Sequence, residues 1–295
     1  MSFCTVPESF AAGMAFDDFA PRLSFFFAAH NDLFEEAAKF RAARAAWAHV
    51  ARDRLGASDP RSMAMRFHVQ TGGSTLTAQQ PETNVVRTTV QALAAILGGA
   101  QSLHTNASDE ALGLPTPATA RLALRTQQVL AAESGVSTPV DPLGGSHYVE
   151  ALTDEIEARV RAELAEIDRR GGTLAALADG YQQAAIADAA YEAQRAIEAG
   201  ERIVIGVNAF VEDGDEQRPQ AQAIDPQAEA EQVTRTRAVR AGRDAARAAE
   251  TLAALEMAAA GTENVVPRIR ACIESQVTLG EISGALRGVW GEHRP

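Results

Sequence analysis

The chain has 295 residues, 46% of them hydrophobic but only 5% aromatic, which is typical of a globular protein with alanine-rich helices. Its formal net charge of −12 argues against a nucleic-acid partner, because phosphate contacts need a basic surface. No window reaches the roughly 18 to 20 apolar residues of a membrane span, and no secretory signal is visible. Two distant cysteines, Cys4 and Cys272, predict neither a disulfide framework nor a zinc site, so the expected compartment is cytoplasmic.

Strand and helix patterns alternate in the first hundred residues. A strand is predicted over residues 22–30, followed by a long amphipathic helix over 33–55, where apolar residues recur at three- and four-residue steps. A second strand covers residues 63–71, a helix about 81–97, and a third strand 100–106. This alternation predicts an α/β fold with parallel strands and right-handed crossovers.

Beyond residue 106 the pattern is mainly helical. Four helices, separated by glycine or proline, are predicted over residues 117–134, 148–169, 174–177 and 182–199.

A strand, a linker and three helices are predicted in the C-terminal third of the chain. The apolar run over residues 202–210 predicts an isolated strand, and residues 213–224 have the composition of a polar linker. Asp225 followed by Pro226 is a helix-start signal, and it predicts one long helix to about Ala260. Two shorter helices are expected to begin near Glu263 and Leu279.

Polar side chains alternate with apolar ones in the predicted strands. They are Arg22 and Ser24, then Arg66, His68 and Gln70, then Gln101 and His104. Because ligands bind at the carboxyl ends of parallel strands, we expect these side chains to converge there on an anionic, amide-bearing ligand. Arginines would grip phosphate and glutamines would bond amides. The alternative is that each is a polar residue inside a barrel whose hydrogen bonds are all made within the protein. Because the pattern recurs in three strands, we favour the ligand-binding interpretation.

Other candidate motifs in the sequence do not indicate a function. The paired glycines in "HVQTGG" and "DPLGGS" match neither a phosphate-binding Walker loop nor a dinucleotide fingerprint. No serine–histidine–aspartate arrangement stands out, and no histidine pair has the spacing of metal ligands, so no metal site is expected. Asp109 and Glu110 fit either a solvated turn or the acidic start of a helix, and the residues alone favour the solvated turn.

Several long stretches resemble the methylmalonyl-CoA mutase family, specifically the large, substrate-binding subunit of adenosylcobalamin-dependent acyl-CoA mutases. They include "RFHVQTGGSTLTAQQPETNVVRTTVQALAAILGGAQSLHTNASDEALGLPT", "VDPLGGSHYVEALTDEIE" and "GERIVIGVN". The similarity covers residues 16–210 almost continuously and continues more weakly to the C-terminus through "GTENVVP" and "TLGEI". Residues 1–14 do not share it.

The resemblance implies a fold and an activity. Residues 15–116 would be the C-terminal portion of a (β/α)8 TIM barrel, with about three of its strands. A helical region with one short strand, residues 117–212, and C-terminal helices over residues 225–295 would follow. The implied activity is a radical rearrangement of the carbon skeleton of an acyl-CoA, with CoA along the barrel axis and cobalamin over the strand ends. By family frequency the expected reaction converts (R)-methylmalonyl-CoA to succinyl-CoA.

The resemblance also assigns roles to individual residues. Gly73, Glu110 and Ala111 would contact the cofactor, while His147 stands where the family usually has tyrosine. The tyrosine–histidine pair that contacts the migrating group in the family has no counterpart here, so the catalytic residues stay unassigned. The substrate and CoA would be bound by Arg22, Ser24, Arg66, His68, Gln70 and Gln101.

Partners follow from what the sequence lacks. Three strands leave a barrel with two open edges and exposed apolar inner faces, so we expect no catalysis by the isolated chain. The expected partners are an acyl-CoA substrate, a chain that supplies the N-terminal barrel half, and a small subunit or domain that binds adenosylcobalamin. The alternatives are a catalytically inactive, truncated mutase fragment and an interaction subunit.

Overall fold

The computed structural model describes residues 13–212 and 225–292. The chain divides into two compact units, Met1–Gln222 and Ala223–Pro295. The predicted linker, and most of the N-terminal segment that does not share the resemblance, lie outside the described residues. Within those residues, no helix is both long enough and apolar enough to cross a membrane.

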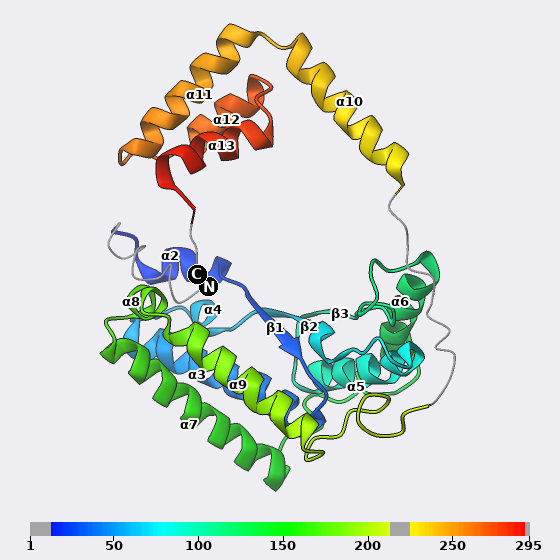
Figure 1. The fold of residues 1–295 in the computed structure, drawn as a ribbon. Helices are drawn as coiled ribbons and strands as arrows, with labels where there is room; N and C mark the ends of the chain where they lie inside the picture. The colour runs from blue at the N-terminus through cyan, green and yellow to red at the C-terminus, as the bar shows by residue number, and fades with distance from the viewer. Residues whose placement is uncertain (1–12, 213–224, 293–295) are drawn as a thin grey trace. The chain divides into compact units, whose positions relative to one another are not determined.

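A three-stranded parallel sheet lies at the centre of the first unit (Figure 1). Its strands are β1 (Phe25–Ala29), β2 (Phe67–Thr71) and β3 (Ser102–His104), adjacent in that order. The predicted parallel α/β arrangement is confirmed, although β3 is shorter than expected. The three strands form an open sheet and close no barrel among the described residues.

The two faces of the sheet differ in burial because side chains alternate along each strand. One face carries Phe67, Val69 and Thr71, all buried, and packs on helices α3 (Leu33–His49) and α5 (Asn84–Leu97). The other face carries Phe26, which is 64% exposed, and the polar residues of β2 and β3. The open face is therefore the one on which the predicted ligand residues lie.

Helix α3 anchors the core. Asp32 caps its first turn by accepting a hydrogen bond from the backbone N–H of Glu35 at 3.1 Å. Trp47 is buried against the sheet, and its indole N–H donates to the carbonyl of Ser62 at 3.1 Å. The helix continues as a wider turn, η2 (Val50–Arg54), so the predicted helix over residues 33–55 is confirmed.

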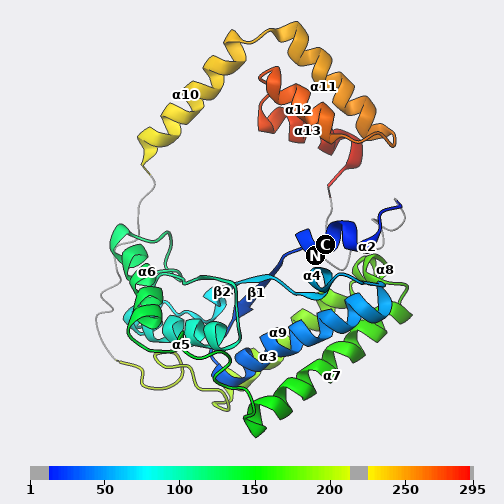
Figure 2. The same ribbon diagram turned by 180° about the vertical axis from the view of Figure 1, so that it is seen from behind.

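Helices α3 and α7 (His147–Arg169) lie side by side in both ribbon views (Figure 2). The two helices run in the same direction, as shown by side-chain contacts whose residue numbers increase together along both helices. Near the start Arg41 pairs with Glu150 at 2.7 Å; farther along His49 contacts Glu157 at 2.9 Å. A ladder of polar contacts therefore fixes α7 against the outer side of α3.

The remaining helices of this unit match the predictions closely. They are α6 (Pro117–Ala132), α8 (Thr173–Ala178) and α9 (Tyr181–Glu198). Shorter turns connect the larger elements: α2 (Phe16–Phe19), η1 (Ala20–Arg22), α4 (Pro60–Met63), η3 (Gly73–Thr75) and η4 (Pro81–Thr83).

The predicted strand over residues 202–210 is wrong. The segment forms turns with a single bridge between Ile205 and Ala209. Its side chain at Asn208 donates to the carbonyls of Ile197 and Arg202 and accepts from the N–H of Val204, which folds the segment back on itself. Arg87 donates to the carbonyl of Ile205 and Gln80 donates to the carbonyl of Phe210. These contacts keep the segment from forming an extended strand.

The second unit is helical. The predicted long helix from Asp225 is divided into α10 (Pro226–Gly242) and α11 (Ala245–Ala260), because Asp244 caps a new helix by accepting from the N–H of Arg247 at 3.0 Å. Helices α12 (Val266–Glu274) and α13 (Leu279–Trp290) follow, as predicted. The core of this unit contains Ala248, Leu255, Cys272, Val277 and Ile282.

Candidate substrate and cofactor site

Four of the six predicted substrate residues lie just before a strand. Arg22 and Ser24 precede β1, Arg66 precedes β2 and Gln101 precedes β3. The prediction that the polar residues gather at the carboxyl ends is therefore wrong for these four. Alternation identifies the face of a side chain, but it does not locate the strand's first residue, and here the polar residues come before it.

Strand pairing brings most of these residues together at the amino edge of the sheet. Phe25 pairs with Phe67, so Ser24 lies beside Arg66. The two line an open depression of about 360 Å³ together with His68 and Gln101. Arg22 is exposed near this edge but does not line the depression.

Two of the residues lining the depression already have backbone partners. The side-chain oxygen of Gln101 accepts from the N–H of Phe67 at 2.7 Å, and its amide nitrogen donates to the carbonyl of Gly99 at 2.8 Å. The guanidinium of Arg66 donates to the carbonyl of Pro21 but is exposed. The side chain of Gln101 therefore binds the first backbone N–H of β2. A ligand would have to compete with these backbone groups for the amide of Gln101.

His68 and Gln70 continue along the open face of β2. The ring of His68 contacts the hydroxyl of Ser102 through Nδ1 at 2.7 Å and lies against Phe26, with 5.0 Å between ring centroids. Gln70 donates to the side-chain oxygen of Asn106 at 2.9 Å and pairs in register with His104. The same face is thus polar from the depression to the carboxyl edge.

The carboxyl edge brings together two of the three predicted cofactor residues. A Cβ on Gly73 would lie 2.9 Å from Nδ2 of Asn106 and 3.5 Å from the carboxylate of Glu110, so a larger residue at this position would require the side chain of Asn106 to shift. Glu110 and Ala111 are exposed. Asn106 is 2% exposed, and its Nδ2 has no hydrogen-bond partner within the described part of the chain. We did not predict Asn106 as a site residue; its position at the end of β3 was the available signal.

Asp109 differs from the solvated turn that the residues alone favour. It is 1% exposed, and its carboxylate accepts from the N–H of Thr116 at 3.1 Å and the hydroxyl of Thr119 at 2.7 Å. Asp109 therefore holds the start of α6, while its neighbour Glu110 is the residue that reaches the surface. A local charge pattern could not separate these two carboxylates because burial depends on α6.

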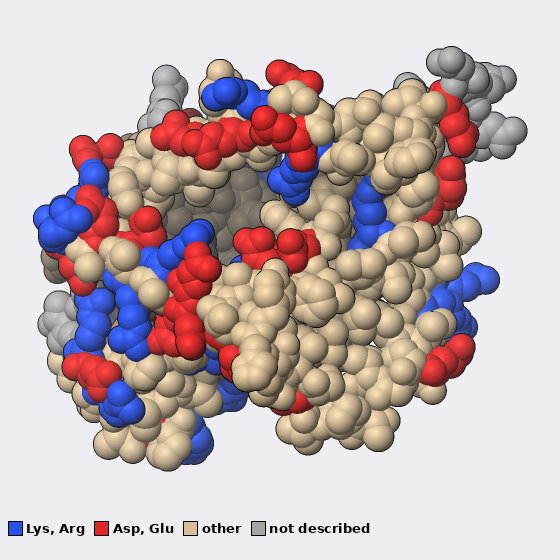
Figure 3. Space-filling model, turned by 90° about the horizontal axis from the view of Figure 1, so that it is seen from below, with Lys and Arg blue, Asp and Glu red and all other residues tan. Residues whose placement is uncertain are grey.

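The face of the molecule seen in Figure 3 carries side chains of both charges. On this face, arginine and lysine side chains are interspersed with acidic ones. Among residues 13–212 and 225–292, no group of three or more histidine, cysteine or acidic side chains could hold a metal ion.

Comparison with known proteins identifies the class. The family model described as methylmalonyl-CoA mutase matches residues 4–292. The chain is 47% identical over 290 residues to the 2-hydroxyisobutanoyl-CoA mutase large subunit of Aquincola tertiaricarbonis, covering 98% of this chain and 52% of the relative. It is 44% identical over 281 residues to the methylmalonyl-CoA mutase of Escherichia coli strain K12, covering 95% and 39%.

These matches define the class, the family of cobalamin-dependent acyl-CoA mutases, whose members are isomerases that use adenosylcobalamin. The chain belongs to the methylmalonyl-CoA mutase family. It spans about half the length of the Aquincola relative and 38% of human mitochondrial methylmalonyl-CoA mutase, to which it is 39% identical. The family match begins at residue 4, inside the segment that shows no resemblance in the sequence analysis.

The carboxyl edge has the chemistry to hold one polar edge of the cofactor that this family uses. Nδ2 of Asn106 is a buried donor without a protein partner among the described residues, and Glu110 beside it is an exposed acceptor. Gly73, which has no side chain, lies next to both of these groups. A donor and an acceptor side by side suit a group that both accepts and donates, such as a hydroxyl or an amide.

Proposed function

We propose that this chain is the C-terminal part of the acyl-CoA-binding subunit of an adenosylcobalamin-dependent mutase. It would act with the rest of the barrel and with a small subunit or domain that binds cobalamin. The observation that carries this proposal is the division of the polar face into two groups. Ser24, Arg66 and Gln101 lie at the amino edge, whereas Gly73 and Glu110 lie at the carboxyl edge.

An extended acyl-CoA fits this division. The five steps from Arg66 to Thr71 span roughly 16 Å at the usual rise of a strand, which suits a pantetheine arm lying along β2. Arg22 and Arg66 would bind phosphate, and Gln70 and Gln101 would bond the amides. His68, between them, would orient the thioester end through the nitrogen that does not contact Ser102. Adenosylcobalamin, when bound, supplies the radical that starts the rearrangement.

Two substrates are candidates. Methylmalonyl-CoA, rearranged to succinyl-CoA, is the substrate expected from the family. The 47% identity to the large subunit of a 2-hydroxyisobutanoyl-CoA mutase favours 2-hydroxyisobutanoyl-CoA as the second. Both are short acyl-CoA thioesters, so the same CoA-binding residues would serve either.

The test is reconstitution of the natural polypeptide that contains this sequence with a cobalamin-binding subunit and adenosylcobalamin. We expect one of the two thioesters to be rearranged, with cobalt–carbon homolysis seen by electron paramagnetic resonance. Arg66→Ala should raise KM for the acyl-CoA by roughly 10- to 100-fold, the loss of one charge-assisted contact.

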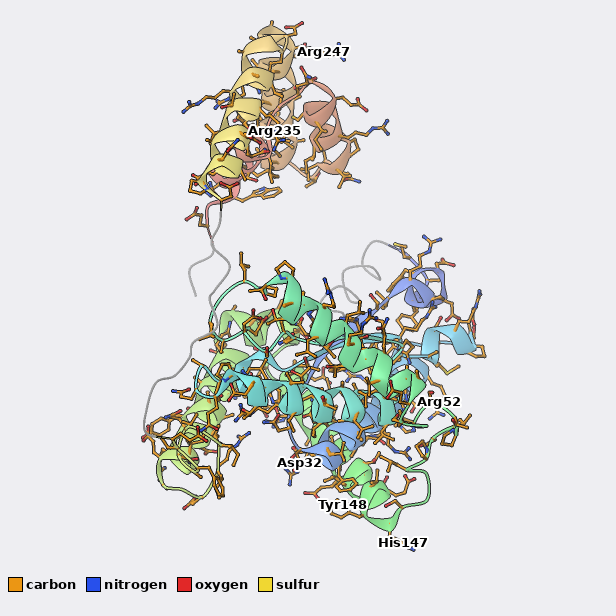
Figure 4. The ribbon with its side chains drawn as sticks, turned by 90° about the vertical axis from the view of Figure 1, so that its right-hand side faces the viewer. Asp32, Arg52, His147, Tyr148, Arg235 and Arg247 are labelled. Carbon is orange, nitrogen blue, oxygen red and sulfur yellow. The ribbon has the colours of Figure 1, made fainter. Side chains whose placement is uncertain are left out.

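Arg52→Ala is the matched control, since Arg52 is an exposed arginine near the far end of α3 that pairs with its neighbour Asp53 (Figure 4). It should leave KM unchanged. If no acyl-CoA causes homolysis in the unmodified complex, the proposed function is wrong and an inactive or interaction role takes its place.

A further inference from the structure

Gln91 is a fully buried amide on α5 whose hydrogen bonds all lead to the carboxyl edge of the sheet. Its side-chain oxygen accepts from the N–H of Gly72 at 2.9 Å. Its nitrogen donates to the side-chain oxygen of Asn31 and to the hydroxyl of Thr75, both at 2.6 Å. A buried amide without partners would be costly, so these three bonds hold Gln91 in one orientation.

The bonds of Gln91 join two segments that follow different strands. Asn31 follows β1, whereas Gly72 and Thr75 belong to the turn after β2. The N–H of Gly72 also donates to the carbonyl of Ala29 at 2.7 Å, and the hydroxyl of Thr75 donates back to the carbonyl of Gly72. Gln91 therefore supports the turn from beneath, on the side away from its exposed surface.

Close packing leaves this turn little freedom. A Cβ on Gly72 would lie 2.4 Å from the ring of His30, and one on Gly73 would lie 2.9 Å from Asn106. A displacement of the turn would therefore change the space between Gly73, Asn106 and Glu110. Gln91 itself is buried beneath the turn, and the side-chain hydrogen bonds that it makes within the described residues go to the turn and to Asn31.

We infer that Gln91 is a positioning residue for the cofactor-facing edge: it holds the Gly72–Thr75 turn so that Gly73 and Asn106 keep their spacing. This inference rests on the proposed function, because it takes the carboxyl edge as the place where cobalamin binds. It predicts that loss of the Gln91 amide weakens the binding of adenosylcobalamin and leaves the binding of acyl-CoA at the amino edge intact.

The test compares Gln91→Leu with Thr88→Val in the natural polypeptide and in its complex with the cobalamin-binding subunit. Thr88 lies one turn earlier on α5, is 2% exposed, and its hydroxyl has no hydrogen-bond partner in the ranges that the structure covers. Gln91→Leu should speed amide hydrogen exchange over residues 72–76. It should also weaken the binding of adenosylcobalamin about tenfold or more, which corresponds to the loss of one or two buried hydrogen bonds. The affinity for acyl-CoA should stay unchanged. Thr88→Val should change none of these.

Several outcomes would overturn the inference. It fails if Gln91→Leu matches Thr88→Val, if exchange rises while adenosylcobalamin affinity stays the same, or if both ligands weaken equally. If Gln91→Leu does not fold, the isosteric change Thr75→Val at a half-buried position removes the bond from Gln91 and the hydroxyl's own bond to the carbonyl of Gly72, and it is judged by the same measurements. If the unmodified complex binds no adenosylcobalamin, the proposed function fails; unchanged exchange in Gln91→Leu would separately refute the support of the turn.

Discussion

A single carboxylate at Asp17 joins the first turns of the chain to the segment before α4. It accepts from the hydroxyl of Ser58 at 2.6 Å, and from the backbone N–H groups of Ser58 and Asp59 at 3.0 and 3.1 Å. The hydroxyl of Ser58 is the largest cause that lowers the pKa of Asp17, from 3.8 to about 2. The ionised form is therefore the one that the fold stabilises.

Asp17→Asn should destabilise the first unit at neutral pH, because an amide replaces a charge that three donors face. A lowered pKa contributes stability that is fully present above the unfolded-state pKa and is lost as pH falls through the folded-state value. The difference in urea midpoint between the two proteins should thus be constant above about pH 5 and shrink between pH 3.8 and about 2. A difference that persists unchanged at the acid end would contradict this role of the charge.

At the scale of elements, Arg41 connects α3 to the loop that starts α7. Its guanidinium donates to the carboxylate of Asp141 at 2.6 Å and to Glu150 at 2.7 Å, and Glu150 also accepts from the N–H of Gly145. Asp141 adopts a positive φ of 46°, which the contact helps to hold. The "DPLGGS" motif, which matched no phosphate loop, is thus held in its conformation by an arginine 100 positions before its first residue.

Arg41→Ala should lower the free energy of unfolding by about 1 to 3 kcal/mol, because its side chain is largely buried and its charge-assisted bonds have no replacement. Hydrogen exchange at Gly145 should also rise. Arg159→Ala is the control: Arg159 is 77% exposed on α7 and pairs only with Glu155 one turn away, so it should cost less than about 0.5 kcal/mol. Equal effects of the two changes would show that Arg41 does not anchor the loop.

The same loop places the two helix starts together. The ring of Tyr148 lies 5.7 Å from that of Phe34, and Figure 4 shows Tyr148 and Asp32 at the same end of the α3–α7 pair. His147, the residue that departs from the family pattern, is exposed at the first position of α7. Nothing in its surroundings explains the departure.

At the scale of the whole molecule, the open face of the sheet determines the self-association that we expect in solution. Phe26, on the edge strand β1, is 64% exposed on this face, and parallel sheets normally have both faces covered. The isolated chain should therefore self-associate, and the rest of the barrel, which we propose as its partner, should suppress the association. Phe26→Ser should reduce self-association in light scattering or sedimentation, whereas Val86→Ser, at a similarly exposed position on α5, should not. Equal effects of the two substitutions would show that the surface responsible for self-association lies elsewhere.

Local signals in the sequence were sufficient for most elements but for only part of the site. Alternation in "RFHVQT", the apolar spacing over residues 33–55 and the helix start at Asp225 act between neighbours along the chain, so strands, helices and the parallel sheet could be predicted. The division at Asp244 was missed although its cap is also a local signal, because the helical pattern continues through it. The turn over residues 202–210 could not be predicted locally, because Arg87 and Gln80 bind its carbonyl groups from 118 and 130 positions away.

By itself the sequence determined the family, the alternation of strand and helix, and which polar residues share one face of β2. Only the tertiary structure decided that the polar residues occupy both edges, that Asp109 is buried while Glu110 is exposed, and that Gln91 supports the turn after β2. The physical reason is distance along the chain: alternation and capping act over a few residues. Strand register and the hydrogen bonds of Gln91 join residues that are 16 to 60 positions apart.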